Sequence, residues 1–185
     1  YSRTHKLADD FGKTLQAADL VFVTDIYAAS EDPIPGVSGQ TIVDAILANG
    51  STKAYFVPDL PTAHHAVGNN LAEGDLFLTL GAGNVHEAGN KIIRDLKVLE
   101  EIRNETKASA IKLYEPMSRH STMRVGGPAQ FWIEPSEFRQ LADSVSFCKA
   151  RGIPVRIVGR GSNLLIRDGG IRGAVIHPAG GAFAA

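Results

Sequence analysis

Over the first hundred residues, short apolar runs alternate with amphipathic stretches of helical length, and this alternation limits the fold more than any other feature. Residues 20–24, 54–57 and 76–80 are short, mainly apolar runs typical of strands covered on both faces. Amphipathic helices are expected near residues 7–18 and over residues 40–48, 61–71 and 85–103. Strands separated by helices of this length form βαβ units. The sequence therefore predicts an α/β fold here, with a parallel, Rossmann-like sheet.

A different pattern begins after residue 104. Residues 105–115 are mostly charged and small, which indicates a linker. Beyond the linker, strands are expected over residues 129–133, 155–158, 164–166 and 174–177, with one helix that Ser136 caps and Gly152 ends. The chain is thus expected to hold two incomplete domains, a truncated α/β domain over residues 1–104 and a partial α+β domain over residues 116–185.

Charge and cysteine content exclude several classes of function. The chain has 19 basic and 20 acidic residues, so it lacks the basic excess of a nucleic-acid-binding or membrane-surface protein. Its apolar runs fall short of the roughly 18–20 residues that a membrane span needs, and no membrane insertion is expected. The single cysteine, Cys148, excludes an internal disulfide framework and fits a reducing, cytoplasmic compartment. No metal site is expected, because no cysteine or paired carboxylate completes a ligand set with the histidines.

Three glycine motifs are candidates for ligand binding. Gly81-Ala82-Gly83-Asn84 lies between an expected strand and a helix, but His86 replaces the third glycine of a dinucleotide fingerprint. A tight turn is therefore favoured, although a helix N-terminus there could face a phosphate. Residues 159–163 lie between two expected strands, so they form either a hairpin loop or a nest for an anion. Gly126-Gly127 is similarly either a turn or a ligand wall.

Residues 121–129, the capped helix and residues 153–173 closely resemble the N-terminal part of UDP-N-acetylenolpyruvoylglucosamine reductases (MurB). In that family these segments belong to the FAD-binding domain. The resemblance implies contacts with the FAD diphosphate from Gly159, Arg160, Gly161, Ser162 and Asn163, and contacts with the cofactor from Thr122, Gly126 and Gly127. The family's reaction passes a hydride from NADPH through FAD to an enolpyruvyl group. Its proton-donating serine would follow the last residue of this chain, so no catalytic residue is expected within it.

Residues 1–4, 25–29, 33–36 and 81–85 together resemble the C-terminal domain of UDP-N-acetylmuramate–L-alanine ligases (MurC), which receives the amino acid. The resemblance implies that Arg3 binds the carboxylate of L-alanine and that Asp25 and Tyr27 face the cleft for nucleotide and amino acid. From the residues alone, Arg3 is either a solvated arginine or a two-pronged carboxylate ligand. The family's ATP-binding P-loop belongs to another domain, so ATP and Mg²⁺ would be bound mainly by parts absent here.

The two resemblances together predict a fragment of a bifunctional, cytoplasmic enzyme of peptidoglycan-precursor synthesis. Its substrates would be UDP-sugars, L-alanine, ATP and NADPH, and the fragment alone is expected to be inactive. The reductase product is the ligase substrate, and a tether would raise its local concentration. Two alternatives remain open, namely a non-catalytic module that binds flavin or UDP-sugar, and another FAD-linked oxidoreductase of the same fold.

Overall fold

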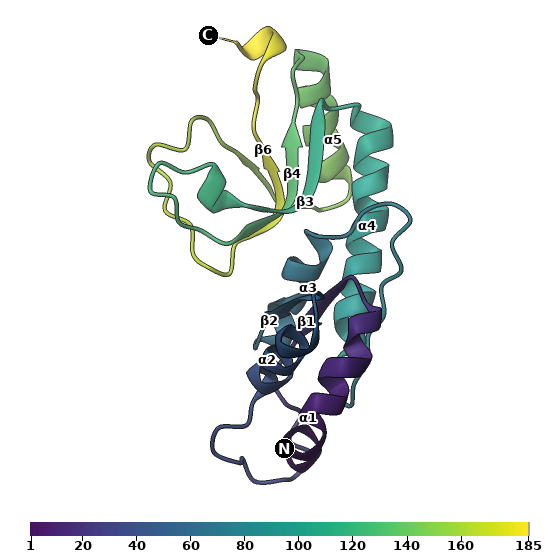
Figure 1. The fold of residues 1–185 in the computed structure, drawn as a ribbon. Coiled ribbons are helices and arrows are strands. Elements are labelled where there is room, and N and C mark those ends of the chain that lie inside the picture. Colours follow the sequence, from purple (N-terminus) through teal and green to yellow (C-terminus); the bar gives the residue numbers. More distant parts are fainter. Residues whose placement is uncertain (185) are drawn as a thin grey trace. The chain divides into compact units, whose positions relative to one another are not determined.

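The computed structural model describes residues 1–184 and divides the chain into two compact units, Tyr1–Gly89 and Asn90–Ala185 (Figure 1). Ala185, the last residue of the expected second domain, lies outside the described residues. The domain boundaries expected at residues 104 and 116 stay a prediction.

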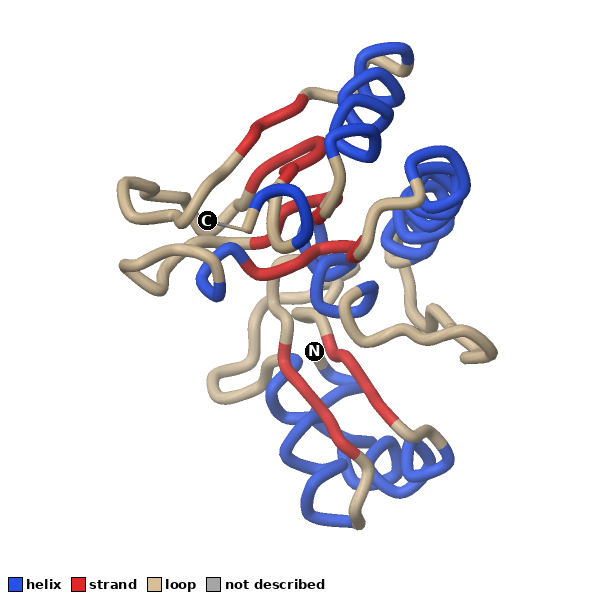
Figure 2. Tube along the Cα trace, turned by 90° about the horizontal axis from the view of Figure 1, so that it is seen from above, coloured by secondary structure: helices blue, strands red, loops and turns tan. Residues whose placement is uncertain are grey.

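The first unit contains a parallel βαβ arrangement. Its elements are α1 (Ser2–Thr14), the short 3₁₀ helix η1 (Leu15–Ala17), β1 (Leu20–Val23), α2 (Gly39–Asn49), β2 (Lys53–Phe56) and α3 (Leu60–Gly68). The two strands run side by side and in parallel, with Leu20 opposite Lys53 and Val23 opposite Phe56 (Figure 2). Val43 and Ile46 of α2 are buried against this sheet. The predicted α/β fold with parallel strands is therefore confirmed.

The strand expected over residues 76–80 does not form. The segment pairs with no other strand in the described part of the chain, and its three leucines, Leu76, Leu78 and Leu80, are 84%, 64% and 74% exposed. Phe77 and Thr79 alternate with them and are partly buried. An alternating apolar run has the side chains of a strand, but a strand also needs an edge to which its backbone can hydrogen-bond. The prediction was wrong because it rested on side chains alone.

The second unit is a four-stranded mixed sheet with helices on one face. Its main elements are α4 (His86–Thr106, from Asn90 onward in this unit), β3 (Ala110–Pro116), β4 (Pro128–Glu134), α5 (Phe138–Ala150), β5 (Val155–Ile157) and β6 (Ile171–Ile176). The strand order is β3-β4-β6-β5, and only the β3–β4 pair is antiparallel. Figure 1 shows α4 and α5 along the same face of the sheet.

Two apolar clusters cover the two faces of this sheet. On the helix-covered face, residues of α4 and α5 such as Ile102 and Phe147 pack against Phe131 and Ile176 of the strands. The opposite face carries a smaller cluster of Met117, Ala129, Trp132, Val158, Ile166 and Val175. The helix-covered face is therefore closed by secondary structure, and the other face is covered by loops.

Three local predictions in this unit were wrong. The expected linker over residues 105–115 contains most of β3, which has polar positions such as Lys112 because it is an edge strand. Residues 164–166 form no strand, since Leu164 and Ile166 anchor a loop in the core instead. Helix α5 begins at Phe138 with Glu137 as its N-cap, while the Ser136 hydroxyl bonds Ser109 at 2.6 Å.

Candidate functional site

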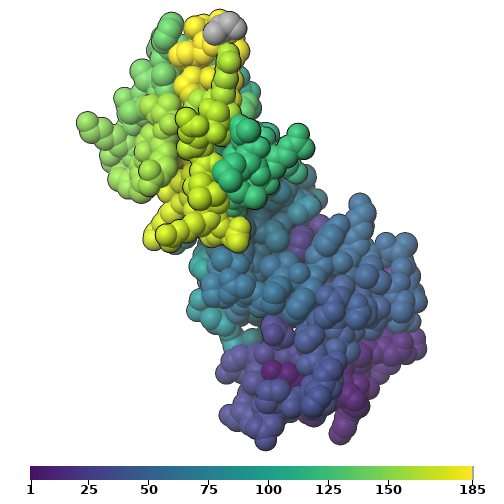
Figure 3. All heavy atoms as spheres, turned by 90° about the vertical axis from the view of Figure 1, so that its left-hand side faces the viewer, coloured from purple at the N-terminus to yellow at the C-terminus, as the bar shows by residue number. Residues whose placement is uncertain are grey.

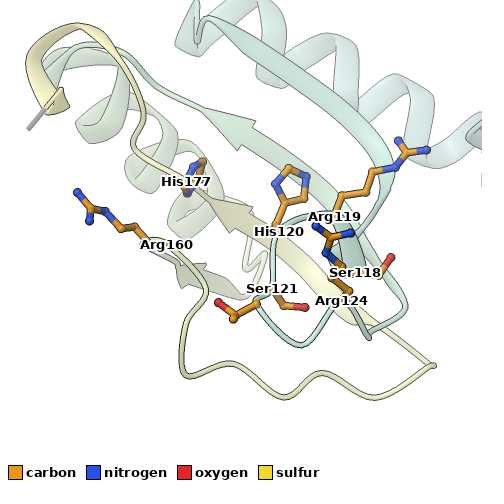
Figure 4. A pocket seen from close by; sticks show the side chains of 9 residues that line it. Ser118, Arg119, His120, Ser121, Arg124, Arg160 and His177 are labelled. Carbon is orange, nitrogen blue, oxygen red and sulfur yellow. The ribbon is translucent and has the colours of Figure 1, made fainter.

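An open pocket of about 910 Å³ lies in the second unit, between the loop after β3 and the loop after β5. It is lined by nine residues, Ser118, Arg119, His120, Ser121, Thr122, Arg124, Gly159, Arg160 and His177. Figure 4 shows the labelled side chains rising from these two loops and from the end of β6. Three arginines and two histidines occur among them without any carboxylate, so the pocket favours anions.

The two loops are held together by their backbones. The Thr122 N–H donates to the Gly161 carbonyl oxygen at 3.2 Å. Gly161 has a φ of +68°, and a Cβ at this position would collide with the carbonyl oxygen of His120. In Figure 3 the teal-green segment after β3 lies against the yellow-green segment that precedes β6. Glycine is therefore required at 161 by the protein itself, whatever binds in the pocket.

Gly159, unlike Gly161, has no close neighbour in the protein that requires a glycine. A Cβ built on it would meet no protein atom within 4 Å, and its backbone is outside the left-handed region. Its neighbour Val158 is buried and its N–H bonds the Ile176 carbonyl at 2.9 Å, so the chain leaves the sheet immediately before Gly159. The open space beside its backbone, among basic side chains, fits a diphosphate that approaches closely.

The other predicted cofactor residues have structural explanations or lie outside the pocket lining. A Cβ on Gly127 would collide with the Asp168 carbonyl, and a Cβ on Gly126 would come within 2.8 Å of Ile166. Both glycines therefore allow the loop before β6 to pack closely. Ser162 and Asn163 are exposed and are not among the lining residues. Their predicted contacts with FAD stay predictions.

The pocket wall contains an aromatic stack that the sequence did not predict. The His120 ring stacks on Trp132 with centroids 3.8 Å apart, and His177 lies 5.2 Å from Trp132. Trp132 is fully buried, and its Nε1 donates to Glu134 at 2.7 Å. The Nε2 of His120 lies 2.9 Å from the buried carboxylate of Glu115. The one feature of the sequence that could have indicated this stack is the basic segment before Gly126-Gly127, which contains His120.

In the first unit, the three residues predicted to bind the ligase substrates are all exposed. Arg3 lies in the first turn of α1, which is tied to the loop after β1 by Glu31. The Glu31 carboxylate accepts from the Ser2 backbone N–H at 2.8 Å and from the Ser2 hydroxyl at 2.7 Å. These contacts bring the start of α1 to the loop that carries Asp25 and Tyr27.

Asp25 and Tyr27 follow the carboxyl end of β1. One Asp25 oxygen accepts from the N–H of Ile26 at 2.9 Å and of Gly39 at 3.3 Å, so it also links β1 to the start of α2. A Cβ on Gly83 would come within 3.0 Å of the Tyr27 ring, which places the Gly81–Asn84 turn beside this loop. The predicted ligase residues therefore gather at one end of the unit, and their predicted roles are untested.

Neither a metal site nor a membrane-spanning helix is found among residues 1–184. Within residues 1–184, no three His, Cys, Asp or Glu side chains gather as a metal site would require. None of the helices in this range combines the length and apolar character that crossing a bilayer demands.

The chain thus combines an α/β unit with a mixed-sheet unit that carries a basic pocket, and comparison with known proteins relates part of it to amide-forming ligases. UDP-N-acetylmuramate–L-alanine ligase of Solibacter usitatus is 45% identical over 107 residues, which are 58% of this chain and 21% of that enzyme. The ligases of Cutibacterium acnes and Desulfotalea psychrophila are each 45% identical over about half of this chain and 20% of their own length. No family profile matches the chain. The chain spans about a fifth of the length of these relatives.

Proposed function

We propose that this chain is part of a bifunctional, cytoplasmic enzyme of peptidoglycan-precursor synthesis. One half would join L-alanine to UDP-N-acetylmuramate with ATP and Mg²⁺, and the other would use FAD and NADPH to reduce UDP-N-acetylenolpyruvoylglucosamine. The ligase half rests on the 45% identity to ligases. The matched length of 107 residues is close to that of the domain expected over residues 1–104.

In the ligase half, the first unit would receive the amino acid. Open α/β sheets bind ligands at the carboxyl ends of their strands, and Asp25 and Tyr27 lie at the end of β1. The exposed guanidinium of Arg3 would hold the carboxylate of L-alanine through two parallel hydrogen bonds. The N–H of Gly39 donates to the Asp25 carboxylate and would fix the direction of this side chain. Activation by ATP would fall to parts of the enzyme outside this chain.

In the reductase half, the basic pocket would bind the diphosphate of FAD. The observation that carries this proposal is the open space beside the Gly159 backbone, where an added Cβ would meet no protein atom within 4 Å. Arg160 and Arg124 would supply positive charge, and the Thr122 hydroxyl a neutral donor. When bound, FAD supplies hydride transfer between NADPH and the enolpyruvyl group. The residues of this chain bind and orient the cofactor, and they include no assigned proton donor.

A single added methyl group tests the flavin proposal. Gly159→Ala places a Cβ where the protein leaves space, so we expect FAD to bind about tenfold more weakly because the cofactor would be crowded. Binding is measured by quenching of flavin fluorescence when FAD is titrated with the protein. Gly169→Ala is the matched control, since Gly169 has the same open surroundings but lies outside the pocket lining. Equal FAD affinity in the two variants would contradict the proposed contact.

A further inference from the structure

One residue of β3 has an unusual backbone conformation. Tyr114 has a φ of +53°, which is rare for a bulky aromatic residue. Across the strand pair, Leu113 lies opposite Phe131 and Glu115 opposite Ala129. Leu113, Tyr114 and Phe131 belong to the helix-covered core, whereas Ala129 belongs to the cluster on the opposite face. The turn of the backbone at Tyr114 therefore moves Glu115 to the face that carries the pocket.

Buried hydrogen bonds hold Tyr114 in this conformation. Its hydroxyl donates to the Asp95 carboxylate at 2.7 Å, and Asp95 is only 3% exposed on α4. The Gln130 amide donates to the same oxygen at 3.0 Å and accepts from the Gly173 N–H at 2.9 Å. Burial, and secondarily the hydrogen bond to Asp95, raises the pKa of Tyr114 well above its usual value. Hydrogen bonds to residues of α4, β4 and β6 thus stabilise the positive φ of Tyr114. A strained backbone conformation that the surrounding structure stabilises often occurs at a functional site.

Glu115 itself is 3% exposed and gathers three basic groups around one carboxylate oxygen. His120 Nε2 is nearest at 2.9 Å, followed by Lys112 Nζ at 3.4 Å and Arg119 Nη1 at 3.8 Å. The 2.9 Å separation between His120 Nε2 and the Glu115 carboxylate is within hydrogen-bonding distance. This bond directs one edge of the imidazole at Glu115, while the ring face lies on Trp132. The orientation of the ring is therefore defined by two independent contacts.

We propose that Glu115 is a positioning residue of the pocket, holding the imidazole of His120 against Trp132 so that a fixed, basic wall faces an anionic diphosphate group. Among the pocket-lining residues, His120 lies within hydrogen-bonding distance of Glu115 at 2.9 Å, and Arg119 lies 3.8 Å from the same carboxylate oxygen. The inference rests on the proposed role of the pocket in binding a flavin dinucleotide. Glu115 touches no ligand and acts through His120.

The single tryptophan of the chain, Trp132, reports on this arrangement without any cofactor. In Glu115→Gln the carboxylate charge is lost and the shape is kept, so the His120 ring is held less firmly on Trp132. We expect changed Trp132 emission and faster acrylamide quenching in the cofactor-free chain. We also expect about tenfold weaker binding of inorganic pyrophosphate and of FAD, the loss that follows weakening of one charged hydrogen bond. Lys112→Gln is the matched control, because Lys112 also contacts Glu115 but does not line the pocket.

A double-substitution cycle separates positioning from a general loss of stability. If Glu115 acts through His120, adding Glu115→Gln to His120→Gln changes pyrophosphate affinity less than twofold, because the shared interaction is already gone. Two fully additive losses would overturn the proposal. The thermal unfolding midpoints of all variants are compared in parallel. Glu115→Asp keeps the negative charge, so it is expected to retain more of the pyrophosphate affinity than Glu115→Gln. If Glu115→Gln fails to fold, an unchanged affinity in Glu115→Asp and in His120→Gln overturns the proposal.

The outcomes also distinguish this inference from the proposed function. Pyrophosphate binding without FAD binding in the unsubstituted chain would contradict the flavin assignment and leave the positioning role to be decided by the cycle. Failure of the unsubstituted chain to bind pyrophosphate overturns the positioning proposal. Unchanged Trp132 emission together with unchanged pyrophosphate affinity in Glu115→Gln overturns it as well.

Discussion

Two glycines of the loop after β5 lie two positions apart and are explained by different physical causes. Gly161 has a positive φ and packs against the His120 backbone, so a side chain there would disturb the protein before any ligand arrived. Gly159 has an ordinary backbone conformation and open space beside it. A substitution at 161 would therefore change both the stability of the protein and its affinity for a ligand. A substitution at 159 is expected to change the affinity alone. The motif in the sequence did not distinguish the two roles.

The buried thiol of Cys148 leads to a prediction about alkaline pH. Burial raises its pKa to about 11 from an ordinary value of 9.0. As pH rises from about 9 to about 11, the unfolded chain loses this proton while the folded chain retains it, so the free energy of unfolding falls. Thermal unfolding followed by circular dichroism checks this expectation. In Cys148→Ala the decrease between pH 9 and 10 should be smaller, and an identical pH profile would contradict the assignment.

At the scale of elements, periodic sequence patterns predicted helices better than strands. The expected ranges of α2 and α4 lie within three residues of the observed bounds, because amphipathic periodicity is a local signal. Strand prediction failed at residues 76–80 and missed β3. An apolar run does not show whether a neighbouring strand is available, and an edge strand carries polar residues that resemble a linker.

The contact between α4 and β3 gives a prediction for stability. Tyr114→Phe removes the hydroxyl that donates to Asp95 and leaves a buried carboxylate with one donor fewer. We expect the free energy of unfolding of the second unit to fall by about 1–3 kcal/mol. Urea unfolding measures this change. Tyr55→Phe is the control, since Tyr55 is 51% exposed, and a comparable loss in both variants would contradict the proposed role of the buried hydroxyl.

At the scale of the whole molecule, the chain carries two units with different sheets and spans about a fifth of the length of its ligase relatives. No P-loop motif of the Gly-x-x-Gly-Lys-Thr type occurs in its sequence. We expect the 185-residue chain to show no L-alanine-dependent ATP hydrolysis and no NADPH oxidation that depends on the enolpyruvyl substrate. Coupled absorbance assays with both UDP-sugars check this expectation. The UDP-N-acetylmuramate–L-alanine ligase of Solibacter usitatus is the positive control for the ligase assay, and robust turnover by the 185-residue chain would contradict the expectation.

The sequence by itself determined the helices, the parallel βαβ pattern of the first unit and the glycine loop at 159–163, because these depend on residues close together in the chain. It also identified Thr122, Gly159 and Arg160, which line the pocket. Only the tertiary structure decided that the loop after β3 meets the loop after β5, and that Glu115 holds His120 on Trp132. Such contacts depend on strand order and on a backbone turn at Tyr114, and no local pattern of residues encodes either.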